Sequence, residues 1–150
     1  EMGSAVHAAS LERPVKLMIA LEMIGYYDST PGSQDYPSPA MSWLYPDRGD
    51  FIAVVGRMQD INAVRQVKAA LLSSRDLSVY SMNAPGFIPG IDFSDHLNYW
   101  QHDIPAVMIT DTAFYRNKQY HLSGDIADRL NYQKMAQVVD GVTTLLYNSK

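Results

Sequence analysis

The sequence has 150 residues and a formal net charge of −4, and 47% of its residues are apolar. A chain of this length and composition can bury one hydrophobic core, which excludes a disordered or fibrous protein. The negative charge argues against nucleic-acid binding, which needs a basic surface. No cysteine is present, so disulfides and thiolate metal sites are excluded, while the cellular compartment stays open. The longest apolar run, residues 15–21, is too short to cross a bilayer.

The first third of the chain predicts a helix, a strand and a long loop. Residues 4–13 favour a short helix that ends before Pro14. Residues 15–24, VKLMIALEMI, are rich in branched apolar side chains and are typical of a buried parallel strand. Residues 26–50 are crowded with proline, glycine, serine and tyrosine. They predict an irregular loop of a length that is usually functional inside a compact domain.

The rest of the chain continues this alternation of strands and helices. The predicted elements are strands over 51–57, 77–82 and 106–110, an amphipathic helix over 60–72, a short helix opening at Ser94 or Asp95, and a closing helix over 132–147. Strands that alternate with helices predict an α/β domain with a largely parallel central sheet.

Polar residues follow three of the predicted strands. They lie in residues 22–28, in the Asp92–His96 segment and in residues 111–125. Sites in α/β sheets form outside the carboxyl ends of the strands, so we expect these three stretches to converge.

Glu22 lies near the carboxyl end of an apolar predicted strand. A buried carboxylate is costly unless it is paired or binds a metal, which makes Glu22 a candidate ligand. Two simpler interpretations stay open at this point. Glu22 can be the last, solvent-facing residue of the strand, or it can pair with a neighbouring arginine.

The segment Asp92–His96 places two carboxylates and an imidazole within five residues. Carboxylate and histidine together form metal shells and acid–base pairs. A simpler interpretation is that Ser94 or Asp95 caps a helix and that His96 lies on the helix surface. The residues taken alone favour the cap.

His121 ends a polar loop that follows the predicted strand 106–110. A single histidine in a loop is more often solvated or hydrogen-bonded than bound to a metal, so both interpretations stay open. Asp125 and Asp128 are predicted to be first-turn and capping residues of the closing helix.

Taken in order, three segments resemble the co-catalytic zinc aminopeptidases, a metallopeptidase family related to glutaminyl cyclases and glutamate carboxypeptidases. The segments are LMIALEMIGYY, DFSDHLNYWQHDIPAVMITDTAFYRNKQYH and DIADRLNYQKMAQVV. The resemblance spans residues 3–142, and its SDH…IPAVMITDT…YH succession is its most specific part. It implies a zinc-exopeptidase-like α/β fold, with a mostly parallel mixed sheet flanked by helices.

The resemblance also implies roles for individual residues. Glu22 matches a terminal carboxylate ligand of one zinc ion, and His121 matches a histidine ligand of the other. Tyr120 matches a tyrosine that donates a hydrogen bond to the developing oxyanion in some members. Asp95 and His96 match residues that stand behind the metal ligands.

Other parts of the family pattern are missing from the sequence. An early His-x-Asp element, a bridging aspartate segment and an adjacent Glu-Glu pair are absent. In the family the Glu-Glu pair precedes a Gly-Ser that opens a helix, which matches Gly3-Ser4. We therefore expect residues 1–150 to be the carboxy-terminal part of a single zinc-peptidase catalytic domain, incomplete on its amino-terminal side. The longer protein is called the parent protein below.

The expected function of the parent protein is hydrolysis of peptides with a free amino terminus, using two zinc ions. This chain keeps one ligand for each ion, whereas a catalytic zinc takes three. We therefore expect the chain alone to bind zinc weakly or not at all and to be inactive. Because the preceding strands of the domain would be missing, we also expect it to self-associate through an exposed sheet edge. The alternatives are a glutaminyl cyclase, which is an acyltransferase, and a degenerate, non-catalytic interaction domain. Retention of Glu22, Tyr120 and His121 argues against the degenerate domain.

Overall fold

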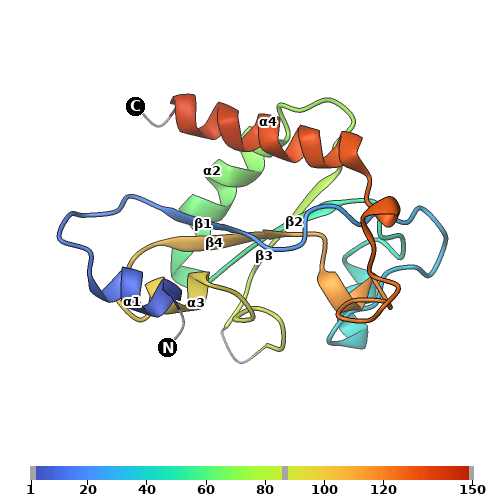
Figure 1. The fold of residues 1–150 in the computed structure, drawn as a ribbon, viewed down its shortest axis with the longest axis horizontal. Helices are drawn as coiled ribbons and strands as arrows, with labels where there is room; N and C mark the ends of the chain where they lie inside the picture. Colours follow the sequence, from blue (N-terminus) through green and yellow to red (C-terminus); the bar gives the residue numbers. More distant parts are fainter. Residues whose placement is uncertain (1–2, 86–87, 149–150) are drawn as a thin grey trace.

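The structure, a computed structural model, describes residues 3–85 and 88–148, which form a sheet with helices on both faces (Figure 1). The strands are β1 (Met18–Leu21), β2 (Ile52–Gly56), β3 (Val79–Asn83) and β4 (Ala106–Thr110). The α-helices are α1 (Gly3–Ala9), α2 (Ile61–Leu71), α3 (His96–Trp100) and α4 (Tyr132–Asn148). The 3-10 turns are η1 (Pro39–Trp43), η2 (Met58–Asp60), η3 (Ala113–Tyr115) and η4 (Ala127–Arg129). The predicted α/β fold is confirmed.

The strand order in the sheet is β1-β4-β2-β3. β1 is parallel to β4, and β2 is parallel to β3, but β2 and β4 are antiparallel. The sheet is therefore mixed. The carboxyl ends of β1 and β4 lie at one end of the sheet, and those of β2 and β3 lie at the other.

This topology corrects one expectation from the sequence. The polar residues after β3 begin at the end of the sheet opposite to those after β1 and β4. Segment 88–95, which leads into α3, lies beneath the sheet (Figure 1). It returns Ser94 to hydrogen-bond distance of Glu22. A loop crossing, rather than a shared strand end, brings this third stretch to the others.

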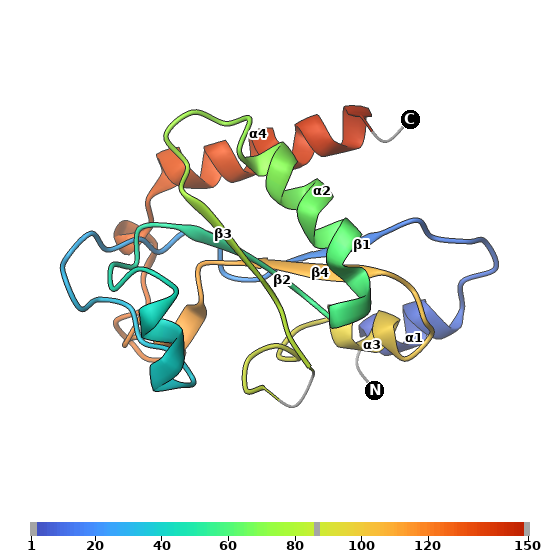
Figure 2. The ribbon, with the colours of Figure 1, turned by 180° about the vertical axis from the view of Figure 1, so that it is seen from behind.

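The two central strands are buried on both faces because their side chains alternate between two cores. On one face, β2 and β4 contribute Ile52, Val54, Val107 and Ile109 to a core closed by α2 and α4. The other face carries Phe51, Ala53, Val55, Ala106 and Met108, which pack with residues of α1 and α3. Figure 2 shows α2 and α4 on one side of the sheet and α1 and α3 on the other.

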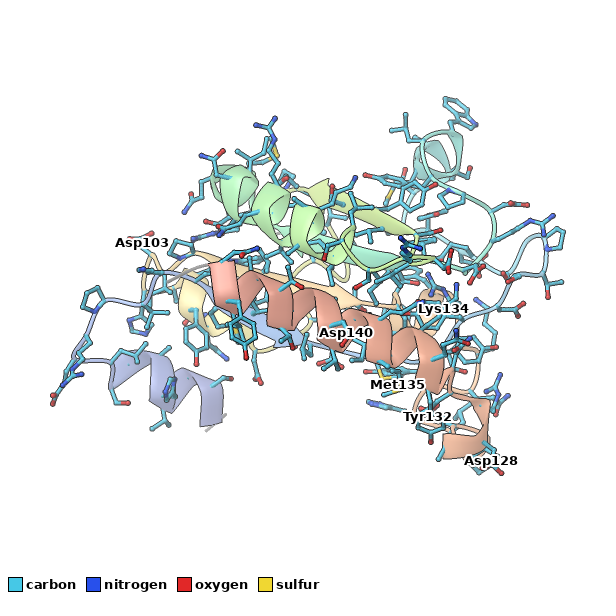
Figure 3. The ribbon with its side chains drawn as sticks, turned by 90° about the horizontal axis from the view of Figure 1, so that it is seen from above. Asp103, Asp128, Tyr132, Lys134, Met135 and Asp140 are labelled. Atoms are coloured by element: carbon cyan, nitrogen blue, oxygen red, sulfur yellow. The ribbon has the colours of Figure 1, made fainter. Side chains whose placement is uncertain are left out.

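Helices α2 and α4 pack closely at Gly141. A Cβ atom placed at Gly141 would lie 2.8 Å from the Cα atom of Leu71 on α2. The amino-terminal turns of α4, where Figure 3 labels Lys134 and Met135, cover the loop that follows β1. Met135 packs against Gly25, and the Lys134 ammonium lies 4.9 Å from the ring centroid of Tyr27.

Several element boundaries differ from the predicted ones. α1 ends at Ala9 instead of running to Pro14, and the Ser10 hydroxyl that follows it donates to the backbone oxygen of His7. Asp125 and Asp128 had been predicted to be first-turn and capping residues of α4, and this prediction is wrong. The Asn131 side chain accepts a hydrogen bond from the backbone N–H of Lys134 and takes that place.

Among the described residues, no helix combines the length and apolarity that crossing a membrane requires.

Candidate functional site

Glu22 follows the last residue of β1 and extends its pairing with β4. Its backbone N–H donates to the carbonyl oxygen of Ile109 at 3.0 Å. The side chain is half-buried and lines a cavity, so Glu22 is not a fully solvated strand end. Its carboxylate contacts the serine hydroxyl described next, and none of the ion pairs found among the described residues joins it to an arginine.

Ser94 is the residue that holds the Glu22 carboxylate. Its hydroxyl donates to Oε2 of Glu22 at 2.9 Å. The local sequence pattern had indicated only a helix-capping role for Ser94. The SDH element does border the site, but the serine makes the contact with Glu22.

Tyr120 and His121 form a stacked pair in the loop between η3 and η4. Their ring centroids are 4.0 Å apart and the planes are inclined by 16°. His121 is exposed and has a left-handed backbone, with φ at +60°. Burial, together with the negative charges of Glu22, Asp125 and Asp111, raises the pKa of Tyr120. Tyr120 is therefore a neutral donor at pH 7, close to the Glu22 carboxylate.

An apolar cavity of about 110 Å³ adjoins these residues, and both Glu22 and Tyr120 line it. Its wall is mainly apolar, and its aromatic and thioether residues include Tyr45, Phe51, Tyr80, Met82, Met108 and Phe114. The long loop 26–50 supplies one wall of the cavity, and residues of β2, β3 and β4 supply another. The arrangement is a mainly apolar chamber whose lining includes the carboxylates of Glu22 and Asp35 and the phenol of Tyr120.

His96 occupies a different environment from the one predicted by the capping interpretation. It is fully buried at 0% exposure, instead of lying on the surface of α3. Its Nε2 donates to the carbonyl oxygen of Ile91 at 2.6 Å, and its ring meets Trp100 edge-to-face at 4.5 Å. Burial lowers the pKa of His96, while the carboxylates of Asp92, Asp95 and Glu22 oppose this shift. His96 is thus a neutral imidazole near Glu22.

Asp95 stands at the N-cap position of α3, but its side chain makes no capping hydrogen bond. Its Oδ1 accepts from the Ser4 hydroxyl at 2.6 Å and so connects α3 to α1. The cap predicted from the local pattern is therefore wrong. The role of Asp95 and His96 behind the metal ligands remains a prediction.

Two buried charged residues near the site were not identified from the sequence. Asp111 follows β4 and accepts three backbone hydrogen bonds, from Gly25, Tyr26 and Ala113. Arg116 is 3% exposed, donates to the backbone oxygens of Tyr26 and Phe51 and lies over the Phe51 ring. Both residues lie in a polar, loop-like segment of the sequence, which does not indicate burial. For Asp111 alone, the position directly after a buried strand is a local hint.

The loop that carries His121 is braced by Asn117, which is 1% exposed. The Asn117 amide donates to Asp125 at 2.8 Å, and its oxygen accepts from Arg129 at 3.0 Å. Arg129 also donates to the Tyr26 hydroxyl at 3.0 Å. These contacts connect the loop after β4 with the loop after β1.

The donor types at this site suit zinc, since carboxylate oxygen and imidazole nitrogen are common zinc ligands. The number of donors falls short. Within residues 3–85 and 88–148, no three His, Asp or Glu side chains gather where they could hold a metal ion. The described residues thus offer Glu22 and His121 as two suitable donors, and they do not complete a catalytic zinc site.

The amino-acid sequence was compared with family models and with curated proteins. No family model matches the chain. YfbL, an uncharacterized protein of Escherichia coli (strain K12), is 93% identical over all 150 residues, and the chain spans 46% of its length. The chain therefore covers about half of this curated relative.

Solved structures with the same fold include two that are described as aminopeptidases, one of them a zinc enzyme. The LapA aminopeptidase of Legionella pneumophila is 20% identical with a TM-score of 0.64, over 96% of this chain and 35% of LapA. LapB of the same organism is 16% identical with a TM-score of 0.67, over 97% of this chain and 35% of LapB. BSAP, a zinc aminopeptidase from Bacillus subtilis, is 17% identical with a TM-score of 0.65, over 98% of this chain and 32% of BSAP. The chain has a peptidase-like fold.

Proposed function

We propose that the parent protein is a zinc-dependent aminopeptidase and that this chain is the carboxy-terminal part of its catalytic domain. The observation that carries the proposal is the placement of Glu22 and Tyr120 on one apolar cavity within a peptidase-like fold. His121 stacks on Tyr120, which lines this cavity. In this proposal, the remaining ligands come from parts of the parent protein outside the chain.

Two zinc ions, when bound, would polarise the scissile carbonyl group and activate a water molecule. The chain's own residues have narrower tasks. Glu22 and His121 each donate to a metal ion, and Ser94 fixes the orientation of the Glu22 carboxylate. The Tyr120 hydroxyl, which is protonated at neutral pH, would donate a hydrogen bond to the oxyanion that develops on the substrate carbonyl.

The cavity supports an apolar amino-terminal side chain on the substrate. Its wall is mainly apolar, so transfer of a leucine or phenylalanine side chain from water into the cavity would be favourable. An acidic side chain would lose hydration without finding a cationic partner among the residues that line the cavity. The parent protein should therefore prefer leucyl to glutamyl substrates.

The test is an assay of the parent protein, for which full-length YfbL can substitute, on leucine p-nitroanilide, glutamate p-nitroanilide and a glutaminyl peptide. The expected result is release of nitroaniline from the leucyl substrate, loss of the activity with a chelator and its return with zinc. Cyclisation of the glutaminyl peptide without nitroaniline release would favour a glutaminyl cyclase instead. Absence of both activities with saturating zinc would favour a non-catalytic domain.

A further inference from the structure

Asp111 is a buried carboxylate that connects the two loops of the candidate site. It follows β4 directly and is 1% exposed. Its Oδ2 accepts from the backbone N–H groups of Gly25 at 3.1 Å and Tyr26 at 2.7 Å. Its Oδ1 accepts from the backbone N–H of Ala113 at 3.0 Å. One side chain therefore binds the loop after β1 and the loop after β4.

The same two loops contain left-handed backbone at residues other than glycine. The φ values are +54° at Met23, +75° at Thr112, +46° at Ala113 and +60° at His121. This conformation is unfavourable for L-residues, most of all for a β-branched one such as Thr112. It persists only where surrounding contacts enforce it, and such residues gather at functional sites.

Asp111 supplies the contacts that close both strained turns. Its backbone N–H donates to the carbonyl oxygen of Met23 at 2.6 Å, on one side of the first turn. Its Oδ2 binds the N–H groups of Gly25 and Tyr26 on the other side. Its Oδ1 binds the N–H of Ala113 within the second turn. Asp111 thus contacts both turns, and the second turn is also held by Thr110, whose Oγ1 accepts from the backbone N–H of Thr112 at 3.0 Å.

Arg116 completes the clamp on the first loop. Its Nη1 donates to the carbonyl oxygen of Tyr26 at 3.0 Å, while Asp111 accepts from the N–H of the same residue. Tyr26 is thus held through both its backbone N–H and its backbone carbonyl. The guanidinium charge also offsets part of the cost of burying the Asp111 carboxylate.

The position requires a group that only accepts hydrogen bonds. A carboxylate can accept on both oxygens, whereas an asparagine amide would direct an N–H₂ group at one set of backbone N–H donors. Burial raises the pKa of Asp111 to about 6, so the charged form is kept at a cost in free energy. The acceptor function at both oxygens accounts for a charged residue where asparagine would be cheaper to bury.

We propose that Asp111 is a positioning residue that aligns the loop after Glu22 with the loop of Tyr120 and His121, so that their side chains face one site. The proposal rests on the proposed aminopeptidase function. Asp111 itself touches neither the metal nor the substrate in this account. It acts through the backbone of the two loops.

The test compares Asp111→Asn with a matched control, Asp60→Asn, in the parent protein. Asp60 is also a buried carboxylate, 6% exposed, but it pairs with Arg57 at the opposite end of the sheet. For Asp111→Asn we expect at least a tenfold loss of zinc affinity and of kcat on leucine p-nitroanilide, with KM changed less than threefold. For Asp60→Asn we expect a lower Tm with zinc affinity and kcat unchanged.

Two results would overturn the proposal. One is wild-type zinc affinity and kcat in Asp111→Asn, because the loops would then be aligned without the carboxylate. The other is a loss of zinc affinity and kcat in Asp60→Asn as large as that in Asp111→Asn, with the two variants having the same Tm. The effect would then reflect general destabilisation.

A second measurement needs no variant and applies even if Asp111→Asn does not fold. Hydrogen exchange in the wild-type parent should show the backbone N–H groups of Gly25, Tyr26 and Ala113 at least a hundredfold slower than exposed amides. Exchange at the rate of exposed loops would contradict the proposal.

The outcomes separate this proposal from the proposed function. A wild-type parent that neither binds zinc nor hydrolyses aminoacyl substrates overturns the function. A wild-type parent that does both, with Asp111→Asn equally active, overturns only the positioning role.

Discussion

The Ser94 hydroxyl donates a hydrogen bond to Oε2 of Glu22 across 2.9 Å, joining residues that lie 72 positions apart. The contact forms because segment 88–95, which leads into α3, lies beneath the sheet and brings Ser94 to Glu22 at the end of β1 (Figure 1). It fixes one oxygen of a half-buried carboxylate, and the proposed function assigns metal binding to this carboxylate.

Removing this hydrogen bond should weaken zinc binding without abolishing it. For Ser94→Ala in the parent protein we expect the free energy of zinc binding to become less favourable by about 1 kcal/mol. This corresponds to a zinc dissociation constant about three- to tenfold larger. Isothermal titration measures it. Ser73→Ala removes a comparable hydroxyl, which donates to Ala70 on the exposed end of α2, and should leave zinc affinity unchanged. Equal affinities in both variants would exclude a role for Ser94 in holding Glu22.

The unfolding free energy of the protein should depend on pH through the titration of Asp111. Burial raises the pKa of Asp111 from 3.8 to about 6, so the folded state binds more protons than the unfolded state between these values. The contribution of this group to the unfolding free energy is therefore present below about pH 4 and is lost as the pH rises through about 6. The expected change is on the order of 2–3 kcal/mol.

Denaturant unfolding of the parent protein and of Asp111→Asn at several pH values isolates this group. The stability of the wild type relative to the variant should fall as the pH rises from 4 to 7. A relative stability that rises over this range would mean that the pKa of Asp111 is lowered on folding, contrary to the burial argument.

Gly141 should not tolerate alanine, although alanine is the better helix former. The added Cβ would lie 2.8 Å from the Cα of Leu71, and backbone cannot yield as a flexible side chain does. We expect Gly141→Ala to separate α2 from α4 and to lower the unfolding free energy by about 1–3 kcal/mol. Gln133→Ala, at an exposed position in the first turn of α4, should change it by less than about 0.5 kcal/mol. A Gly141→Ala protein as stable as Gln133→Ala would refute the packing argument.

The isolated chain should self-associate through β1. This strand pairs with β4 on one side and forms an edge of the sheet on the other, and Leu21 at its end is 49% exposed. Leu21→Lys should therefore shift the chain toward the monomer in light scattering at high concentration. Leu72→Lys changes a similarly exposed leucine at the end of α2, 54% exposed, and should not. A wild-type chain that stays monomeric would count against the exposed-edge hypothesis.

The sequence predicted the elements whose burial is recorded in their own residues. The run Ala106–Thr110 is apolar at nearly every position because both faces of β4 are covered, so the pattern indicates a central strand without further information. The spacing of apolar residues on α2 and α4 follows equally from each helix having one covered face.

The sequence could not predict contacts made between distant segments. His96 was interpreted as a surface residue, because nothing in its neighbours records that Trp100 and Ile91 enclose it. Asp111 and Arg116 lie in polar segments that resemble solvated loops, and their burial depends on the return of the loop 26–50 over them. The direction of β3 relative to β4 was likewise set by pairing, which local composition does not encode.

The most direct test of the account is the number of zinc ions that the parent protein binds tightly. Titration followed by metal analysis should give two ions for the wild type and one fewer for both Glu22→Gln and His121→Ala, with leucyl-nitroanilide hydrolysis lost in each. The controls Glu12→Gln and His102→Ala, at exposed positions, should keep both ions and the activity. Two tightly bound ions in either ligand variant, or activity equal to that of the wild type, would contradict the assignment of Glu22 and His121 as metal ligands.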